Sequence, residues 1–204
     1  YDEITPQMIA EIRREITAVI NSFDRPLLFK NLNAGQRLRL MTKCFPKAKF
    51  IFITREPVYT AQAILKSKRV LGLNDNDFWS IMPPNVKELE IMGGYEQIVK
   101  QIYYLENQIV KDSALAANNC FYMIHLNDLS VPYISTLARS FGFSNRAKHA
   151  EFPIIHVNEK ISINEHDFSS LKKQVDRLDW TFMNNCTKLH PVPTSGLSSQ
   201  AKIL

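Results

Sequence analysis

The chain has 204 residues, of which 45% are hydrophobic and 22% are charged, and its formal net charge is +5. This composition is ordinary for a soluble globular protein, and the length suits one α/β domain or two very small ones. It excludes a membrane-spanning helix, because no apolar run approaches the roughly 20 residues that such a helix needs. The charge favours an anionic partner or substrate, although an ordinary basic surface explains it more simply.

The start of the chain and its cysteines indicate a cytoplasmic protein. The sequence begins with Tyr1 rather than Met and shows no signal-peptide pattern, so we expect a trimmed or partial product. The cysteines, Cys44, Cys120 and Cys186, are scattered, and no two have metal-ligand spacing. We expect reduced thiols and no metal, with one disulfide plus a free thiol as the alternative.

Short apolar runs and helical periodicity alternate along the chain. In chain order, they predict a helix at 5–22, a buried strand at 27–30 ("LLFK"), a helix at 36–45, a strand at 49–54 ("KFIFIT"), a helix at 57–69, a short helical piece at 77–79, a long helix at 95–117, a strand at 120–126 ("CFYMIHL"), and helices at 132–141 and 165–178. The region 144–163 is expected to be irregular.

This alternation predicts an α/β fold with a mostly parallel sheet flanked by helices. We expect a single domain over residues 1–190 and a flexible tail over 191–204. In such sheets, ligands bind beyond the carboxyl ends of the strands. That rule selects Lys30 and Asn31 after the first predicted strand, Arg55 after the second, and Asn127 and Asp128 after the third.

Arg55 follows a predicted buried strand and precedes Pro57, which suits the first position of a helix. A buried guanidinium needs an anion, because its desolvation is otherwise costly. Beside the free N–H groups of a helix start, Arg55 could bind a phosphate with two hydrogen bonds. The alternative is that Arg55 pairs with a neighbouring carboxylate such as Asp128 and only holds the turn.

Several segments carry a resemblance to a known family. They are "RPLLFKNLNAGQRLRL" at 25–40, "FPKAKFIFITREPVYTAQAILKSKR" at 45–69, "FWSIMPPNVKELEIMGGYEQIVKQIYYLENQI" at 78–109 and "CFYMIHLNDLSVPYISTLARSFGF" at 120–143. In order and spacing, they resemble the strands, turns and helices of sulfotransferases that use PAPS (3′-phosphoadenosine 5′-phosphosulfate). The resemblance implies a P-loop-like fold and transfer of a sulfuryl group from PAPS to a hydroxyl or amine, on a carbohydrate or small molecule.

The resemblance also implies roles for individual residues. Arg55 is expected to bind the 3′-phosphate, and Lys160 to reach the adenosine end of PAPS. Sulfuryl transfer needs a cation at the leaving phosphate. Lys30 is the candidate catalytic cation, and a solvated lysine at a turn is its alternative interpretation.

Three further residues are candidates for substrate binding. Asn31 and Asn33 could hydrogen-bond the substrate or simply brace their turn. Trp79 could stack on a sugar or anchor its own segment. The sequence identifies no catalytic base, no acceptor and no oligomeric state.

Departures from the family pattern support a second interpretation. Ala63 stands where the family has a serine, and Leu126 and Asn127 replace a Tyr-Glu pair. The family's first strand and its Gly/Ser/Thr-rich phosphosulfate loop are absent and are expected before Tyr1. We therefore expect residues 1–204 alone to transfer no sulfuryl group from PAPS. The alternative is a catalytically inactive binding or scaffolding module. A nucleic-acid binder is supported by charge alone, since the basic residues do not interleave with aromatics.

Overall fold

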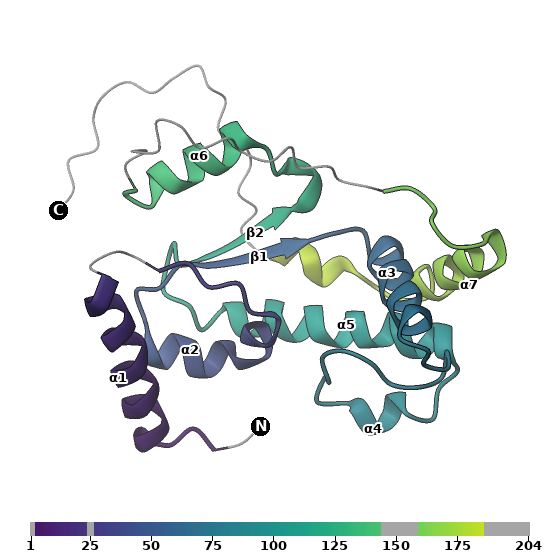
Figure 1. Cartoon of the computed structure of the whole chain (residues 1–204), viewed down its shortest axis with the longest axis horizontal. Helices are drawn as coiled ribbons and strands as arrows, with labels where there is room; N and C mark the ends of the chain where they lie inside the picture. The colour runs from purple at the N-terminus through teal and green to yellow at the C-terminus, as the bar shows by residue number, and fades with distance from the viewer. Residues whose placement is uncertain (1–2, 24–26, 144–158, 186–204) are drawn as a thin grey trace.

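The computed structural model describes residues 3–23, 27–143 and 159–185 (Figure 1). Among these residues, none of the helices combines the length and the apolar character required to span a bilayer. The elements in chain order are α1 (Pro6–Phe23), η1 (Leu32–Arg37), α2 (Leu38–Cys44), β1 (Phe50–Thr54), α3 (Pro57–Val70), α4 (Val86–Leu89), α5 (Gly94–Ser113), β2 (Phe121–His125), η2 (Leu126–Asp128), α6 (Val131–Ser140), α7 (Glu165–Val175) and η3 (Thr181–Asn185).

The fold is α/β and mostly helical, with one short parallel sheet. β1 and β2 pair in parallel from Phe50 opposite Phe121 to Thr54 opposite His125. The described residues form a sheet of two strands, and α3, α4 and α5 lie between them in the sequence. Because the strands are parallel and end together, their carboxyl ends lie side by side.

The main core lies where α3, α5 and α7 pack together. Its centre is a set of side chains that are at most 3% exposed: Ala61, Leu65, Ile98, Val99, Ile102 and Leu171. A second cluster joins the sheet to α5, with Met123 of β2 against Val110 of α5. Apolar residues at helical spacing on α5 therefore contact both α3 and the sheet.

Helix α1 is attached to the rest of the chain through a polar contact. The Arg13 side chain donates hydrogen bonds of 2.8 Å to the carbonyl oxygens of Lys43 and Cys44, at the end of α2. These carbonyls lack partners within their own helix, and the cation matches the negative end of the helix dipole. Cys44 and Cys120 are buried free thiols, as expected, and burial raises the pKa of Cys44.

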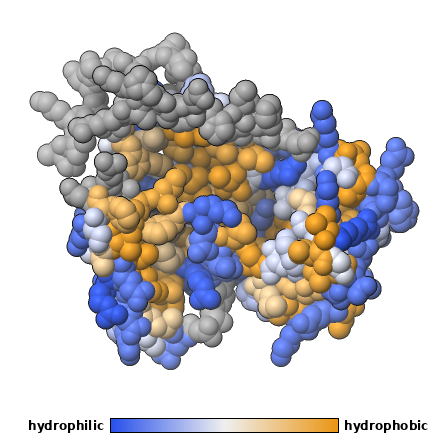
Figure 2. Space-filling model, in the orientation of Figure 1, coloured by the Kyte–Doolittle hydropathy of each residue, from blue (hydrophilic) through white to orange (hydrophobic). Residues whose placement is uncertain are grey.

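Most predicted elements are confirmed within one or a few residues, but the strand at 27–30 is wrong. This segment has no regular secondary structure and does not pair into the sheet, and Leu28 is 91% and Phe29 60% exposed. With Ile51 and Ile53 of β1, they are among the exposed large hydrophobic residues, and Figure 2 shows apolar surface gathered over the middle of the molecule. An apolar run of this length becomes a strand only when a neighbouring strand pairs with it.

The short helical piece predicted at 77–79 is also wrong. Side-chain oxygens that accept hydrogen bonds from the backbone hold the loop instead: the Asn74 N–H donates to Asp77, and the Gly94 N–H donates to Asn76. Any side chain at Gly94 would clash with the backbone carbonyl of Asp75, so this close approach requires glycine. The next helix is α4. The predictions for 144–158, Cys186 and the tail lie outside the described residues.

Candidate functional site

A cavity of about 460 Å³ opens at the carboxyl ends of β1 and β2. Its polar lining residues come from three parts of the chain: Thr54, Arg55 and Glu56 at the end of β1, His125 and Asp128 at the end of β2, and Glu106 on α5. Its apolar lining includes Met123 and, from the C-terminal part of the described chain, Val175, Trp180 and Met183. The cavity therefore lies beyond the carboxyl ends of the strands, where parallel sheets commonly bind ligands.

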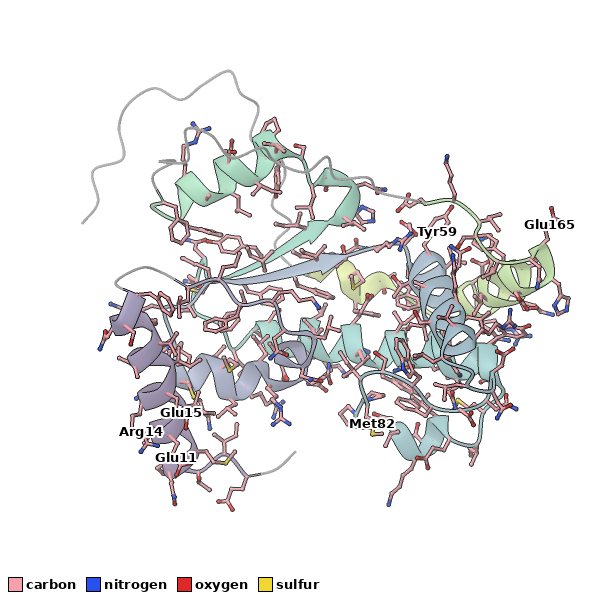
Figure 3. All side chains as sticks on the ribbon, in the orientation of Figure 1. Glu11, Arg14, Glu15, Tyr59, Met82 and Glu165 are labelled. Atoms are coloured by element: carbon pink, nitrogen blue, oxygen red, sulfur yellow. The ribbon has the colours of Figure 1, made fainter. Side chains whose placement is uncertain are left out.

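Arg55 is partly buried and its guanidinium is held by an aromatic ring. The Cζ atom of Arg55 lies 5.5 Å from the centroid of the Tyr59 ring. Tyr59 is in the first turn of α3, and Figure 3 shows it where β1 passes into this helix. Thr54, the last residue of β1, is buried and donates from Oγ1 to the Ile124 carbonyl of β2 at 3.4 Å. These contacts fix the position of Arg55 at the strand end.

The start of α3 adds positive potential next to Arg55. Pro57 occupies the first helical position, where a missing N–H is no loss. The N–H groups of a first turn and the helix dipole both favour an anion. A guanidinium beside such a turn has the geometry to bind phosphate through charge-assisted hydrogen bonds.

The end of β2 provides a histidine in a defined orientation. Nδ1 of His125 accepts a hydrogen bond from the Asn127 backbone N–H at 3.2 Å. In the neutral ring, this leaves the proton on Nε2. The Asn127 side chain in turn donates to Glu159 at 2.9 Å. The turn after β2 is thus connected to the segment that precedes α7.

Glu106 is the unusual member of the lining. Its Oε2 atom is buried and has no hydrogen-bond partner among the described residues. Burial, with no compensating cation, raises the pKa of Glu106 to about 8. The side chain is therefore mainly protonated and neutral near neutral pH. A carboxyl in this state is both a hydrogen-bond donor and an acceptor.

The apolar wall of the cavity contains an oriented indole. Nε1 of Trp180 donates to the Val175 carbonyl at 3.1 Å, which fixes the ring. Tyr103 of α5 contacts both Trp180 and Phe182 edge-on, with centroid distances of 5.3 Å. Such edge-to-face packing restricts the rings further. The wall is a rigid aromatic surface next to the polar groups.

Comparison with known proteins identifies no family for this chain. No protein-family model, no curated protein and no solved structure matches the chain. Among the described residues, there is also no group of three His, Cys, Asp or Glu side chains that could hold a metal ion.

Of the residues predicted as site residues, Arg55 lines the cavity. Lys30 is exposed in the segment before η1, and Lys160 is exposed before α7. Neither belongs to the cavity lining given by the described residues. Ala63, the position of the family serine, is exposed on α3.

The predicted substrate-binding residues have structural roles in their own segments. Oδ1 of Asn31 accepts from the Asn33 N–H at 2.8 Å and caps η1, as the turn interpretation expects. The Trp79 carbonyl accepts from the Gln101 side chain of α5 at 2.9 Å. Asn31, Asn33 and Trp79 do not line the cavity formed by the described residues.

Sequence reasoning missed Glu106, although the sequence carried a signal. Val99, Ile102 and Val110 are buried on α5, and Glu106 is at the helical spacing that belongs to the same face. An acidic residue on the buried face of an amphipathic helix is unusual, because an isolated charge there is costly. Such a position predicts either a buried ion pair or a carboxyl with a raised pKa.

Proposed function

We propose that this protein is a PAPS-dependent sulfotransferase that transfers a sulfuryl group to a hydroxyl or amine acceptor, with a P-loop-like fold and a cytoplasmic location. The observation that carries the proposal is the position of Arg55: it lines a cavity at the carboxyl end of a parallel strand and beside a helix start. The resemblance over residues 25–143 supports the same function, because Arg55 lies at its 3′-phosphate-binding position. The small or carbohydrate acceptor follows from the resemblance alone.

The cavity suits a nucleotide in size, and Arg55 supplies a cation in a lining that also contains the carboxylates of Glu56 and Asp128. Its volume of about 460 Å³ is in the range of small-molecule sites, ~300–1,000 Å³. Arg55 and the start of α3 would hold the 3′-phosphate. Because the pKa of Glu106 is raised to about 8, its carboxyl carries little negative charge near neutral pH and does not repel an anion.

When bound, PAPS supplies the sulfuryl group, and the protein must stabilise the negative charge that develops on the leaving phosphate. Lys30 is the residue that we propose for this role, from its position in the resemblance. Lys30 is exposed, so its side chain is free to approach a bound nucleotide from outside the cavity lining. Lys160 is proposed at the adenosine end, and Trp79, Asn31 and Asn33 at the acceptor, on the same ground.

A binding module without catalysis is the second candidate, and Ala63 is the observation that favours it. Ala63 is an exposed residue on α3, two turns after Arg55, and its methyl group provides no hydroxyl for a phosphate. A module of this kind would still bind the nucleotide through Arg55. The two candidates therefore differ in turnover and agree in binding.

Calorimetric titration with adenosine 3′,5′-bisphosphate, the product of sulfuryl transfer, tests the binding that both candidates share. The Arg55→Ala variant should bind more weakly by about 1.5–3 kcal/mol, the value of a hydrogen bond to a charged group. Arg14→Ala is the control, because it removes the same charge from an exposed site on α1, far from Tyr59 in Figure 3. Equal affinities for the wild type and Arg55→Ala would remove Arg55 from the site.

Transfer of radiolabelled sulfate from PAPS separates the enzyme from the module. If Lys30 acts on the transferring group, Lys30→Ala should lower turnover far more than nucleotide affinity, because its charge matters most in the transition state. Equal losses in both would assign Lys30 to binding. Nucleotide binding without transfer by the wild type, across hydroxyl and amine acceptors, would favour the binding module.

A further inference from the structure

The cavity at the carboxyl ends of β1 and β2 is rich in acidic groups, although the chain as a whole has a formal charge of +5. The described residues that line it include one guanidinium, Arg55, and three carboxyls, Glu56, Glu106 and Asp128. A concave lining with an excess of one charge concentrates ions of the opposite charge. The cavity therefore favours a cation, in addition to the anion that Arg55 would hold.

Glu106 is the carboxyl in this lining that most needs a cation. Its Oε2 atom is buried and has no hydrogen-bond partner among the described residues. A buried polar atom without a partner carries a free-energy cost, so it is rarely retained unless something else satisfies it. A ligand cation that donates an N–H to Oε2 would satisfy this atom with a charge-assisted hydrogen bond.

An aromatic ring borders the same part of the cavity as Glu106. Tyr103 and Glu106 are three residues apart on α5, so their side chains lie on the same side of the helix. The Tyr103 ring contacts the Trp180 ring edge-on, at a centroid distance of 5.3 Å. Trp180 and Glu106 both line the cavity. This pairing suits an organic cation, because aromatic rings attract cations and Trp does so most strongly.

The chemistry of the lining limits which cation fits. Among the described residues, no group of three His, Cys, Asp or Glu side chains could hold a metal ion. A quaternary ammonium carries the charge but has no N–H, so it would leave Oε2 of Glu106 without a donor. A primary ammonium has N–H donors for Oε2, and its carbon substituent can lie against the apolar side chains of Met123, Trp180 and Met183.

We propose that this cavity is a binding site for a primary ammonium group and that Glu106 is the carboxylate that accepts its N–H. A phosphate held by Arg55 in the same cavity would strengthen this binding, because it adds negative charge. Within the proposed function, on which this further step rests, the ammonium belongs to the acceptor. The acceptor is then an amine and not a hydroxyl.

Calorimetry with three probes that share a benzyl group tests the proposal on the wild type near pH 7. Benzylamine is a primary ammonium, benzyltrimethylammonium has the charge without an N–H, and benzyl alcohol has a donor without the charge. Benzylamine should bind about ten-fold or more tightly than either of the others, the value of a hydrogen bond to a charged group. An equal affinity for either of the other two probes would overturn the proposal.

Two variants show whether Glu106 is the group that binds. Glu106→Gln keeps the shape and removes the charge, so it should weaken benzylamine binding by about ten-fold and leave benzyl alcohol binding unchanged. Glu56→Gln is the matched control, because it removes a carboxyl from the same lining. Glu56 is exposed and its charge is screened, so the loss should be much smaller. Equal losses in two folded variants, checked by circular dichroism, would overturn the role of Glu106.

The proton of Glu106 provides an independent measurement. Burial holds this proton up to about pH 8, so an ammonium that binds the carboxylate near pH 7 must displace it. Calorimetry in two buffers of different ionisation enthalpy should show that the wild type releases more protons on binding benzylamine than Glu106→Gln does. The variant keeps the other titratable or charged groups at the cavity, which are Arg55, Glu56, His125 and Asp128. Equal proton release by the two proteins would overturn the role of Glu106.

The outcomes distinguish this proposal from the proposed function. If benzylamine binds as expected and adenosine 3′,5′-bisphosphate does not bind, the proposed function fails and the ammonium site stands without its role as an acceptor site. If the bisphosphate binds through Arg55 and benzylamine binds no better than benzyl alcohol, the ammonium site is overturned and the proposed function stands.

Discussion

Asp167 and Glu106 each have carboxyl atoms removed from water, and the surroundings of these two carboxyls are opposite. Asp167, in the first turn of α7, accepts hydrogen bonds from the Arg69 guanidinium, the Tyr95 hydroxyl and the Asn164 side chain. These donors, Arg69 above all, lower the pKa of Asp167 to about 2. Glu106, on α5, has a buried Oε2 without a partner among the described residues, and burial raises its pKa to about 8.

The contrast shows that hydrogen-bond donors and nearby cations, and not burial alone, decide whether a buried carboxyl is ionised. Asp167 joins α7 to Arg69 of α3 and Tyr95 of α5, so its charge stabilises the packing of three helices. Oε2 of Glu106 has no hydrogen-bond partner among the described residues, and the side chain lines the cavity. A fully satisfied carboxyl indicates a structural role, and an unsatisfied one beside a cavity indicates binding.

The largest expected effect concerns Glu106 and pH. The folded state holds the Glu106 proton up to about pH 8, whereas the ordinary value is 4.5. Between these values the folded state binds more protons than the unfolded state, so stability falls as pH rises. The loss is on the order of 4 kcal/mol for a shift of this size. Urea unfolding of the wild type and of Glu106→Gln across this range measures it.

Glu106→Gln keeps the shape of the side chain but has no proton to lose. Its advantage in free energy of unfolding over the wild type should therefore grow steadily from about pH 5 to about pH 8 and then level off. Parallel pH curves for the two proteins would show that Glu106 is not held neutral, and the contrast with Asp167 would break down.

Removing the other carboxyl should destabilise the fold at neutral pH. Asp167→Ala leaves Arg69 and Tyr95 without their shared acceptor, so we expect a loss of about 2–3 kcal/mol in the free energy of unfolding. The figure allows for screening, because the Arg69 side chain is 38% exposed. Asp176→Ala is the control at the other end of α7: its pair with Lys172 is more than half exposed and should contribute less than about 0.5 kcal/mol.

The smallest expected effect comes from removing one hydrogen-bond donor of Asp167, the Tyr95 hydroxyl. Tyr95→Phe removes only the hydroxyl that donates to Asp167, so we expect a loss of about 1 kcal/mol and a higher pKa for Asp167. Tyr104→Phe, whose hydroxyl lies 3.5 Å from Glu88 at an exposed site, should change stability little. If both variants behave alike, the Tyr95 hydroxyl makes no contribution to the low pKa of Asp167, which then comes from Arg69 and Asn164.

Local patterns were enough to predict most of the fold. The helices and both strands depend on spacing, proline positions and β-branched residues, which act within a few residues. The strand predicted at 27–30 would have needed a neighbouring strand to pair with. Without one among the described residues, Leu28 and Phe29 are exposed. The loop at 74–77 depends on contacts with Gly94 of α5, which no local pattern contains.

The candidate site was predictable only in part, for the same reason. Arg55 could be found because the end of a parallel strand is a local feature with a known meaning. Trp180 and Met183 reach the cavity from a segment more than a hundred residues later in the chain, and only tertiary packing brings them there. Glu106 carried a local signal, its place on the buried face of α5, but its consequence depended on the absence of a nearby cation.

The two buried glutamines of α5 have a consequence for motion. Gln97 donates to the carbonyls of Asn76 and Leu89, and Gln101 to those of Trp79 and Ile81. These four amide hydrogen bonds attach the Trp79 segment to the long helix without any charge, so added salt does not loosen them. The segment is therefore held firmly against α5. Its backbone is released only when this part of α5 itself opens, on the slow timescale of hydrogen exchange.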